Sequence, residues 1–219
     1  KALRYDLTVP FARFVVMNRN DLTFPFRRYQ IQPVWRGDRP GKGRYQEFTQ
    51  CDADIIGSTS TLCELDLIQI FNEALTNLCV PNYTIHINDR RILSALAFSL
   101  GLDDSMLTEF TVAIDKYDKV GVEGVVEEFD SRGFSDKVKS GVKSIFEANK
   151  AGSNSAVLNE IKSLIGDSEE GTSGLNDVET LLNRSNSLGI NEPNVKFDAM
   201  LARGLDYYTG AIFEVRVED

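Results

Sequence analysis

The sequence predicts an α+β protein in which a helical segment interrupts a core of strands and helices. Residues 1–92 mix strand-like and helix-like stretches, whereas residues 93–192 are polar, acidic and helical in pattern. From residue 193 to residue 219 the chain returns to strand patterning, because apolar residues alternate there with charged ones. We therefore expect a core in two parts, 1–92 and 193–219, with a helical domain at 93–192 inserted between them.

Composition limits the class of protein. Of the 219 residues, 42% are hydrophobic and 26% are charged, which is ordinary for a globular protein of one or two domains. The formal net charge of −9 argues against a protein that coats nucleic acid with a broad basic surface, but it allows a local basic patch. The single histidine, His86, excludes a histidine-based metal cluster.

The same features predict the compartment. The sequence contains no run of 18 apolar residues that would predict a membrane span, and no signal peptide opens it. The three cysteines lack metal-ligand spacing, which suits reduced thiols. We expect a cytoplasmic protein without a membrane partner. Both ends fall within patterned sequence, so we also expect a fragment of a longer chain.

Residues 61–89 predict a helix followed by a strand. "TLCELDLIQIFNEALTNLC" has apolar residues at helical spacing, and "YTIHIND" alternates as a half-buried strand does. The residues expected on the buried face of the helix are Leu67, Phe71, Leu75 and Leu78.

The stretch "WRGDRPGKGRYQEF", residues 35–48, concentrates positive charge in an acidic protein. A strand-like run precedes its glycine-rich loop and another follows, so the two strands are expected to pair as an antiparallel hairpin. Glycines let the main chain approach a ligand, and guanidinium groups bind phosphates through two parallel hydrogen bonds. The pattern predicts a triphosphate site. The alternative is an exposed hairpin whose arginines pair with nearby acids.

Strand alternation predicts a polar face on the second strand of this hairpin. Carboxylates and amides are costly to bury without partners, so this face suits the floor of a polar pocket rather than a core. Arg36, near the loop end of the first strand, is expected to reach the same pocket. The residues expected on the face are Arg44, Phe48, Gln50, Asp52 and Asp54.

These residues resemble a known motif. "VWRGDRPGKGRYQEF" is similar to motif 2 of class II aminoacyl-tRNA synthetases, in the form found in the histidyl-tRNA synthetase family. The resemblance implies that Arg36 contacts the ATP α-phosphate and the amino-acid carboxylate. It also implies that Asp38 lies near the adenine end and that Arg44 is a second arginine facing ATP.

Two further stretches resemble the same family. "LRYDLTVPFAR", residues 3–13, resembles the segment that binds the amino-acid ammonium group, which implies this role for Asp6 and Thr8; a carboxylate and a hydroxyl are suitable acceptors for such a cation. "ARGLDYYTG", residues 202–210, resembles the family's signature peptide. There Arg203 matches an arginine that approaches the α-phosphate opposite the motif 2 arginine and binds the amino acid.

The resemblance also implies how histidine would be selected. Tyr207 and Tyr208 match residues that wall the histidine pocket, Gln50 matches an amino-acid contact, and Asp54 matches an acid paired with the imidazole. An imidazole has two ring nitrogens, so a selective site needs a partner for each. Asp54 and Tyr208 would supply them. Ligands that lack these groups would leave the site unsatisfied and bind less well.

For the whole chain the resemblance implies a class II synthetase-type antiparallel β-sheet flanked by helices, with the helical insertion near the tRNA acceptor stem. The implied ligands are L-histidine, ATP with Mg²⁺, and histidine tRNA, and the implied parent is a homodimer. Motif 1, motif 3 and the anticodon-binding domain of the family are missing from this sequence. The implied activity, histidine activation and transfer to tRNA, therefore belongs to the complete protein.

Other interpretations stay open. Histidyl-synthetase-like domains also serve as regulatory subunits and as sensors of uncharged tRNA, without catalysis. Retention of Arg36, Arg44 and Arg203 favours the enzyme. A prolyl or threonyl synthetase is disfavoured by the Arg-Gly-Leu-Asp-Tyr-Tyr peptide, and a general nucleotide-binding scaffold accounts for fewer residues.

Overall fold

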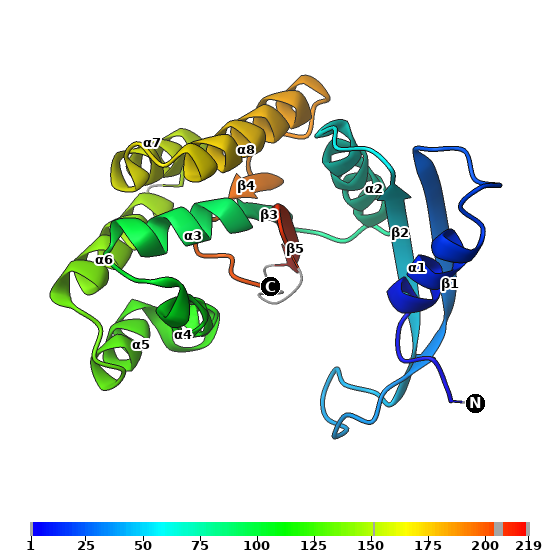
Figure 1. Ribbon diagram of the computed structural model, residues 1–219, viewed down its shortest axis with the longest axis horizontal. Coiled ribbons are helices and arrows are strands. Elements are labelled where there is room, and N and C mark those ends of the chain that lie inside the picture. Colours follow the sequence, from blue (N-terminus) through cyan, green and yellow to red (C-terminus); the bar gives the residue numbers. More distant parts are fainter. Residues whose placement is uncertain (1, 151, 204–207, 218–219) are drawn as a thin grey trace. The chain divides into compact units, whose positions relative to one another are not determined.

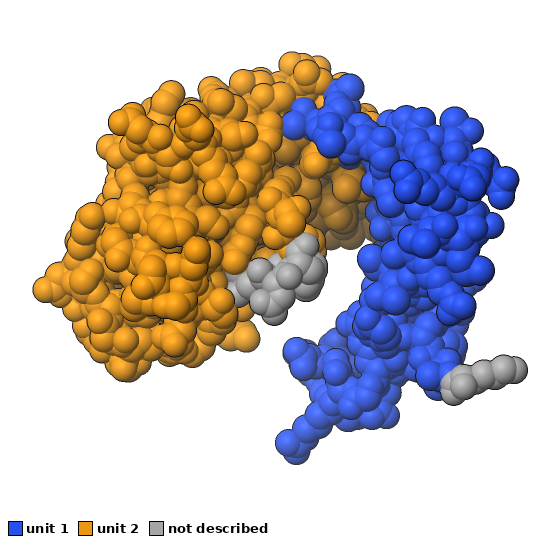
Figure 2. All heavy atoms as spheres, viewed as in Figure 1, with its two compact units in different colours: residues 1–63 blue, residues 64–219 orange. Residues whose placement is uncertain are grey.

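The computed structural model describes residues 2–150, 152–203 and 208–217. The chain divides into two compact units, Lys1–Cys63 (unit 1) and Glu64–Asp219 (unit 2), which are coloured separately in Figure 2. This division concerns compactness, so the domain boundaries expected after residues 92 and 192 stay a prediction. The helices in the described part of the chain lack the length and apolar character of a membrane span.

Unit 1 is built on an antiparallel hairpin (Figure 1). β1 (Phe26–Trp35) and β2 (Glu47–Ile56) are paired along their whole lengths, which confirms the predicted hairpin. α1 (Thr8–Met17) precedes them, and Phe11 of this helix stacks on Phe26 with ring centroids 6.2 Å apart. The N-terminal segment and α1 therefore lie against one face of the hairpin, called its inner face here.

The inner face of the hairpin is polar and its outer face is largely apolar. On the outer face, Tyr29 is 80% exposed and Ile31 is 59% exposed. Among the described residues of unit 1, the buried apolar side chains are Leu7, Val15 and Val34. In unit 1, the polar residues of the strands are therefore less exposed than the apolar ones. This is the reverse of the usual arrangement in proteins.

The loop between β1 and β2 closes on a tight turn. The Arg36 N–H donates to the Gln46 carbonyl at 2.9 Å, so pairing continues for one residue beyond each strand. Gly41 and Arg44 exchange two main-chain hydrogen bonds around the two residues between them. Gly43 has a φ of 73°, a left-handed conformation that glycine adopts without strain.

α2 (Leu62–Asn77) confirms the predicted helix but not all of its predicted buried face. Leu65 and Ile68 are the residues buried along it, whereas Phe71 and Leu78 are exposed. The prediction is therefore wrong for Phe71 and Leu78. Because this helix carries apolar residues on more than one side, periodicity alone did not identify the side that packs.

A three-stranded sheet lies at the centre of unit 2. β3 (Tyr83–Asp89) is flanked by β4 (Val195–Phe197), which runs parallel to it, and by β5 (Ala211–Val217), which runs antiparallel. The strand predicted at 83–89 is confirmed, and the strand patterning predicted from residue 193 onward corresponds to β4 and β5. The sheet mixes both directions of pairing, so the expected antiparallel arrangement holds for β1–β2 and β3–β5 but not for β3–β4.

β3 is more deeply buried than the sequence predicts. Both of its faces are buried, and His86 is its one partly exposed residue. The polar residue Asn88 is accommodated because its Nδ2 donates to the Ala199 and Leu201 carbonyls, at 3.2 and 2.9 Å. The predicted half-burial of β3 is therefore wrong, because the main chain after β4 covers polar positions that alternation alone places in solvent.

The segment between β3 and β4 is helical, as predicted for residues 93–192. Four of its helices, α3, α4, α7 and α8, begin where a side chain accepts main-chain N–H groups, namely at Asp89, Asp103, Ser153 and Ser168. Figure 1 shows α7 and α8 side by side. The helices are α3 (Arg90–Ser99), α4 (Asp104–Ile114), α5 (Tyr117–Ser131), α6 (Asp136–Lys150), α7 (Asn154–Ile165) and α8 (Glu169–Ser187).

One apolar core joins these helices to the sheet. It contains Ile85 and Ile87 of β3, Leu96 of α3, Phe129 of α5 and Phe146 of α6, each at most 1% exposed. Burial of aliphatic and aromatic side chains on this scale is the main stabilising contribution in such a unit. The apolar core of unit 2 therefore supports the sheet from which other residues of this unit project.

Candidate functional site

The predicted strand residues of unit 1 gather on the inner face of the hairpin. The alternation predicted for β2 is confirmed from Phe48 to Asp54. Side-chain hydrogen bonds run along the neighbouring strand: Arg28 Nη1 donates to Gln30 Oε1 at 3.0 Å, and Gln30 Nε2 donates to Gln32 Oε1 at 3.1 Å. The opposed pairs across the two strands are Arg28 with Asp54, Gln30 with Asp52, and Gln32 with Gln50.

Gln50 has an unsatisfied acceptor on this face. Its Oε1 atom is buried and has no hydrogen-bond partner among the described residues. A buried carbonyl oxygen without a donor is costly, so such atoms in native proteins call for a partner from outside the chain. A ligand N–H group placed there would supply it.

Asp54 is committed to an ion pair. Its Oδ2 atom lies 2.6 Å from Arg28 Nη2, and the Arg28 guanidinium also donates to the Leu7 carbonyl and lies over the Phe11 ring. Burial raises the pKa of Asp54 above its ordinary value, and the charge of Arg28 offsets this only in part. The predicted imidazole contact of Asp54 would use the oxygen that Arg28 leaves, and it stays a prediction.

Arg36 is held by neutral groups. Its Nε donates to the Tyr5 carbonyl at 3.1 Å, and its guanidinium carbon lies 5.1 Å from the centre of the Phe48 ring. These contacts bring Arg36 to the same face as Phe48, as expected. Because they are a carbonyl and an aromatic face, they orient the guanidinium without neutralising its charge.

Asp38 and Arg44 lie on the exposed loop. β2 begins at Glu47, so Arg44 lies outside the strand and the predicted continuation of alternation to Arg44 is wrong. The loop main chain is held by Gln46, whose Nε2 donates to the Asp38 carbonyl at 3.3 Å. Both charged side chains are therefore accessible to a ligand.

Asp6 and Thr8 lie at the start of α1. Asp6 Oδ1 accepts a hydrogen bond from the Val9 N–H at 3.2 Å, and Thr8 is the first residue of the helix and is exposed. Asp6 thus stabilises the helix start. A carboxylate has more than one acceptor site, so this contact leaves capacity for a cationic ligand.

In unit 2, Arg203 contacts the carboxylates of Glu214 and Asp115. Its Nε donates to Glu214 Oε2 at 2.9 Å and its Nη2 donates to Glu214 Oε1 at 3.4 Å. Its Nη1 lies 3.4 Å from Asp115 Oδ1, at the end of α4. Tyr208 is exposed, whereas Tyr207 lies outside the described residues. The predicted histidine contacts of Tyr207 and Tyr208 stay predictions.

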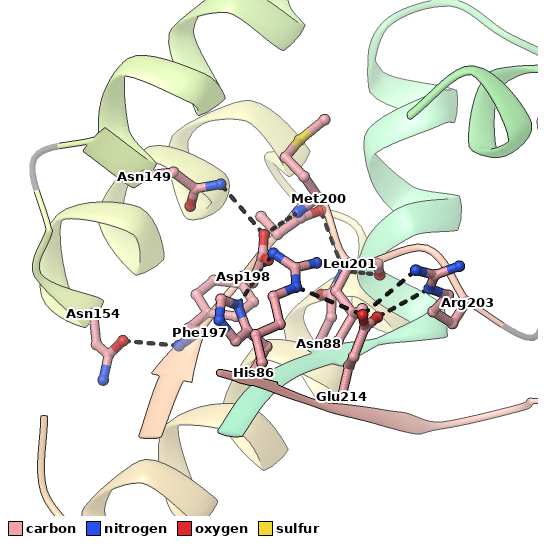
Figure 3. Close-up of polar contacts among 12 residues, drawn as sticks. His86, Asn88, Asn149, Asn154, Phe197, Asp198, Met200, Leu201, Arg203 and Glu214 are labelled. Atoms are coloured by element: carbon pink, nitrogen blue, oxygen red, sulfur yellow. Dashed lines mark hydrogen bonds and ion pairs between the residues drawn. The ribbon is translucent and has the colours of Figure 1, made fainter. Parts of the chain in front are cut away.

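A chain of charged side chains continues inward from Arg203 (Figure 3). Arg216 Nε lies 3.6 Å from Glu214 Oε1, and Arg216 Nη1 donates to Asp198 Oδ2 at 3.1 Å. Asp198 Oδ2 is also 2.9 Å from His86 Nδ1. Figure 3 shows Arg203, Glu214, Asp198 and His86 close to one another, and His86 on β3 is directly opposite Glu214 on β5.

Both carboxylates in this chain are stabilised in their ionised form. Burial would raise the pKa of Asp198, but the hydrogen bond from His86 and the charge of Arg216 bring it below its ordinary value. Burial likewise opposes ionisation of Glu214, yet its hydrogen bond from Arg203 and the charge of Arg216 lower its pKa. The chain is therefore a series of alternating charges.

Sequence reasoning missed several residues that the structure brings to these sites. In unit 1 they are Arg28, Gln30 and Gln32, whose signal was the polar alternation within "RYQIQ". In unit 2 they are His86, Asp198, Glu214 and Arg216. Within the part of the chain that the structure describes, no group of three or more His, Cys, Asp or Glu side chains could hold a metal ion.

Comparison with known proteins identifies the family. The model of the family described as histidyl-tRNA synthetase matches residues 2–219. The histidine–tRNA ligase of Cytophaga hutchinsonii is 48% identical over 217 residues, which are 99% of this chain and 47% of that protein. The chain thus spans about half the length of the curated relatives it matches.

Solved structures agree in fold. The histidyl-tRNA synthetase from Nostoc sp. PCC 7120 superposes with a TM-score of 0.88 at 29% identity, covering 99% of this chain and 49% of that one. A Bacillus halodurans C protein named as an ATP phosphoribosyltransferase regulatory subunit/histidyl-tRNA synthetase gives 0.82 at 24% identity, covering 98% and 54%. These neighbours confirm the predicted class II synthetase-type fold. The chain belongs to the histidyl-tRNA synthetase family.

Proposed function

We propose that the complete protein is a histidine–tRNA ligase, of which this chain is the part that carries motif 2 and the signature peptide. It would join L-histidine to ATP, forming histidyl-adenylate and diphosphate, and would then transfer the histidyl group to histidine tRNA. Membership of the histidyl-tRNA synthetase family supports this proposal. The parent would be a cytoplasmic homodimer, as the resemblance implies.

The observation that carries the proposal is the polar inner face of the β1–β2 hairpin. There the buried Gln50 Oε1 has no partner among the described residues, while Asp54 is kept on the same face by Arg28. An amino acid with a charged ammonium and an imidazole offers N–H donors to such acceptors. Asp6 and Thr8 would add acceptors for the ammonium, and Tyr208 would meet the second ring nitrogen, with Tyr207 beside it.

ATP would be bound by the arginines. Arg36 and Arg203 would each neutralise negative charge that develops on the α-phosphate as the histidine carboxylate attacks it in line. Arg44 would add a further phosphate contact, and Asp38 would lie near the adenine. Mg²⁺ would arrive as the ATP complex. The attacking carboxylate is already ionised at neutral pH, so this step needs no general base.

In the second step the terminal ribose of histidine tRNA would accept the histidyl group. The helical segment 93–192 would lie near the tRNA acceptor stem, as the resemblance implies. Its acidic character means that contacts with the phosphates would depend on individual lysines and arginines.

The alternative is a regulatory or sensing protein without catalysis. The name of the Bacillus halodurans neighbour includes such a role, but its 24% identity concerns fold alone. A protein that had lost catalysis would have no need to keep the arginines at 36, 44 and 203. Their presence favours the ligase.

The test is adenylation by the complete protein, measured as exchange of pyrophosphate into ATP. Arg203→Ala should slow the exchange by about 10²–10³-fold, because one preorganised charge-stabilising donor is lost. Arg216→Ala would be an unsuitable control because Arg216 contacts Glu214, so the control is Arg132→Ala, which removes an arginine paired with Glu128 on α5. An Arg203→Ala enzyme with near-normal exchange would refute the role of Arg203.

Calorimetric titration of histidine into this chain, with and without ATP, separates binding from catalysis. Histidine should bind more tightly than histidinol or proline, because they lack the carboxylate and the imidazole respectively. A complete protein that binds histidine but exchanges no pyrophosphate would support the regulatory alternative. A complete protein that binds no histidine would refute the ligase.

A further inference from the structure

We propose that Glu214 is a positioning residue for Arg203, and that Arg216, Asp198 and His86 hold Glu214 in place. The inference rests on the proposed role of Arg203 at the α-phosphate. It concerns a side chain on β5 that would not itself touch substrate. Its geometric basis is the chain of contacts shown in Figure 3.

Glu214 binds one edge of the Arg203 guanidinium. The contact is two-pronged, through Nε at 2.9 Å and Nη2 at 3.4 Å, which fixes the plane of the group as well as its location. The remaining end, at Nη1, faces Asp115 at 3.4 Å. Because Glu214 fixes the plane of the guanidinium, it also determines where the Nη1 end points.

Glu214 is itself held in place by neighbouring residues of the sheet. It stands on β5 directly opposite His86 on β3, and Arg216 lies two residues further along the same strand, on the same face. Arg216 bridges Glu214 to Asp198, with Nε 3.6 Å from Glu214 and Nη1 3.1 Å from Asp198. A carboxylate held by two arginines on a strand has little freedom to follow Arg203 if Arg203 moves.

Asp198 anchors the inner end of the chain. Its Oδ2 faces His86 Nδ1 at 2.9 Å, while its Oδ1 accepts from the Met200 N–H at 3.1 Å and from Asn149 Nδ2 at 3.4 Å. The side-chain exposure falls from 48% at Arg203 to 12% at Asp198. The contacts thus run from a solvent-facing arginine to a buried carboxylate on the same segment that leads into Arg203.

This arrangement explains why an arginine proposed for anion binding is paired with carboxylates. A flexible arginine would have to lose rotamer freedom each time it met the transition state. An arginine held in advance does not, and misplacement of a reacting or stabilising group by about 1 Å can cost on the order of 10²-fold in rate. Arg216 supplies a positive charge beside Glu214 that partly compensates the charge of this carboxylate.

The test is a double-mutant cycle in the complete protein, read as the kcat of pyrophosphate exchange. Glu214→Gln keeps the size of the side chain but removes its charge, and it should lower kcat by about 10- to 100-fold. The same substitution in an Arg203→Ala background should change kcat by less than about twofold, because a positioning residue has nothing left to position. Glu128→Gln is the matched control, since Glu128 also pairs with an arginine, Arg132, and should leave kcat unchanged.

A second variant distinguishes the positioning role from an effect on local folding. Arg216→Gln removes the bridge between Glu214 and Asp198, and it should lower kcat in the wild-type background but not in the Arg203→Ala background. Thermal unfolding of each variant shows whether unit 2 stays folded. Equal slowing in both backgrounds would mean a merely structural role and would overturn the proposal. An unchanged kcat for Glu214→Gln, with Arg203→Ala slow, would overturn the positioning role while leaving the proposed function intact. A normal Arg203→Ala enzyme would overturn both.

Discussion

The two units hold their predicted substrate arginines in opposite ways. In unit 1, Arg36 is oriented by the Tyr5 carbonyl and the Phe48 ring, both uncharged. In unit 2, Arg203 is oriented by carboxylates, Glu214 and Asp115. Arg36 therefore presents its full charge to a ligand, whereas Arg203 presents a charge that is partly compensated but more firmly directed.

The difference teaches that orientation and charge are separable contributions to anion binding. A neutral cradle favours affinity for any anion, because nothing nearby opposes the positive charge. A carboxylate cradle favours a defined direction of approach. The two arginines of this chain are therefore examples of the two contributions, Arg36 of a neutral cradle and Arg203 of a carboxylate one.

The units also differ in what stabilises them. Unit 2 has a continuous apolar core, with Phe110, Phe129 and Phe146 fully buried. The described part of unit 1 buries Leu7, Val15 and Val34, and much of its strand surface is covered by polar contacts instead. Unit 1 therefore depends more on hydrogen bonds and ion pairs, whose net contributions are individually small.

The largest expected effect tests this contrast in cores. Phe129→Ala removes a fully buried ring that packs on Phe110 and Phe134 and should destabilise unit 2 by about 3–5 kcal/mol. Ile31→Ala on the exposed outer face of the hairpin should change the free energy of unfolding by no more than about 0.5 kcal/mol. Urea unfolding of this chain measures both. Comparable losses would mean that the outer face of the hairpin is buried in solution.

A smaller effect separates two carboxylates that both pair with arginine. Asp198→Asn removes a largely buried charge that pairs with Arg216 and His86, and it should cost about 3 kcal/mol of unfolding free energy. Asp54→Asn should change it by about 1 kcal/mol or less, because the cost of burying the Asp54 charge already offsets its pairing with Arg28. Similar losses for both substitutions would contradict the contrast.

The pH dependence of stability should have opposite signs at these two residues. The folded-state pKa of Asp198 is lowered, so its contribution is complete above about pH 4 and is lost as the pH falls through that lowered value. The folded-state pKa of Asp54 is raised by burial, so its contribution is present at acid pH and is lost as the pH rises through that raised value. The free energy of unfolding, measured between pH 3 and 7, should therefore fall more steeply towards acid pH in wild type than in Asp198→Asn.

The fold was largely predictable where one local pattern decided the structure. The hairpin followed from two alternating strands around a glycine-rich loop, and β5 followed from alternation of apolar with charged residues. β3 and α2 were predicted as elements but not in their burial. Their buried faces depend on which distant segments cover them, such as the main chain at residues 199–201 over Asn88, and periodicity within one segment carries no such information.

Site residues were predictable only where motif spacing marked them. Arg36, Asp54 and Arg203 stand within recognisable peptides, although their roles as ligand contacts stay predictions. The contact between Asp198 and His86 joins residues 112 positions apart, so it depends on the pairing of β3 with β4 and β5. When the register of these strands is not known, the sequence alone gives no reason to expect a contact between Asp198 and His86.

The smallest expected effect concerns the neutral cradle of Arg36. Phe48→Leu keeps an apolar side chain but removes the aromatic face 5.1 Å beneath the guanidinium. A cation–π contact at an exposed site contributes about 0.5–1 kcal/mol, which corresponds to roughly a two- to fivefold change in affinity. We expect the KM for ATP of the complete protein to rise by about that factor.

The hairpin offers a matched control for this substitution. Tyr29 is an aromatic residue on the outer face of the same two strands, so Tyr29→Leu removes a ring from the hairpin without touching Arg36. Phe48→Tyr should behave as wild type, because a phenol ring also presents a negative face to a cation. If Tyr29→Leu raised the KM for ATP as much as Phe48→Leu, the effect would come from the stability of the hairpin. In that case Arg36 would owe its orientation to the Tyr5 carbonyl rather than to the ring.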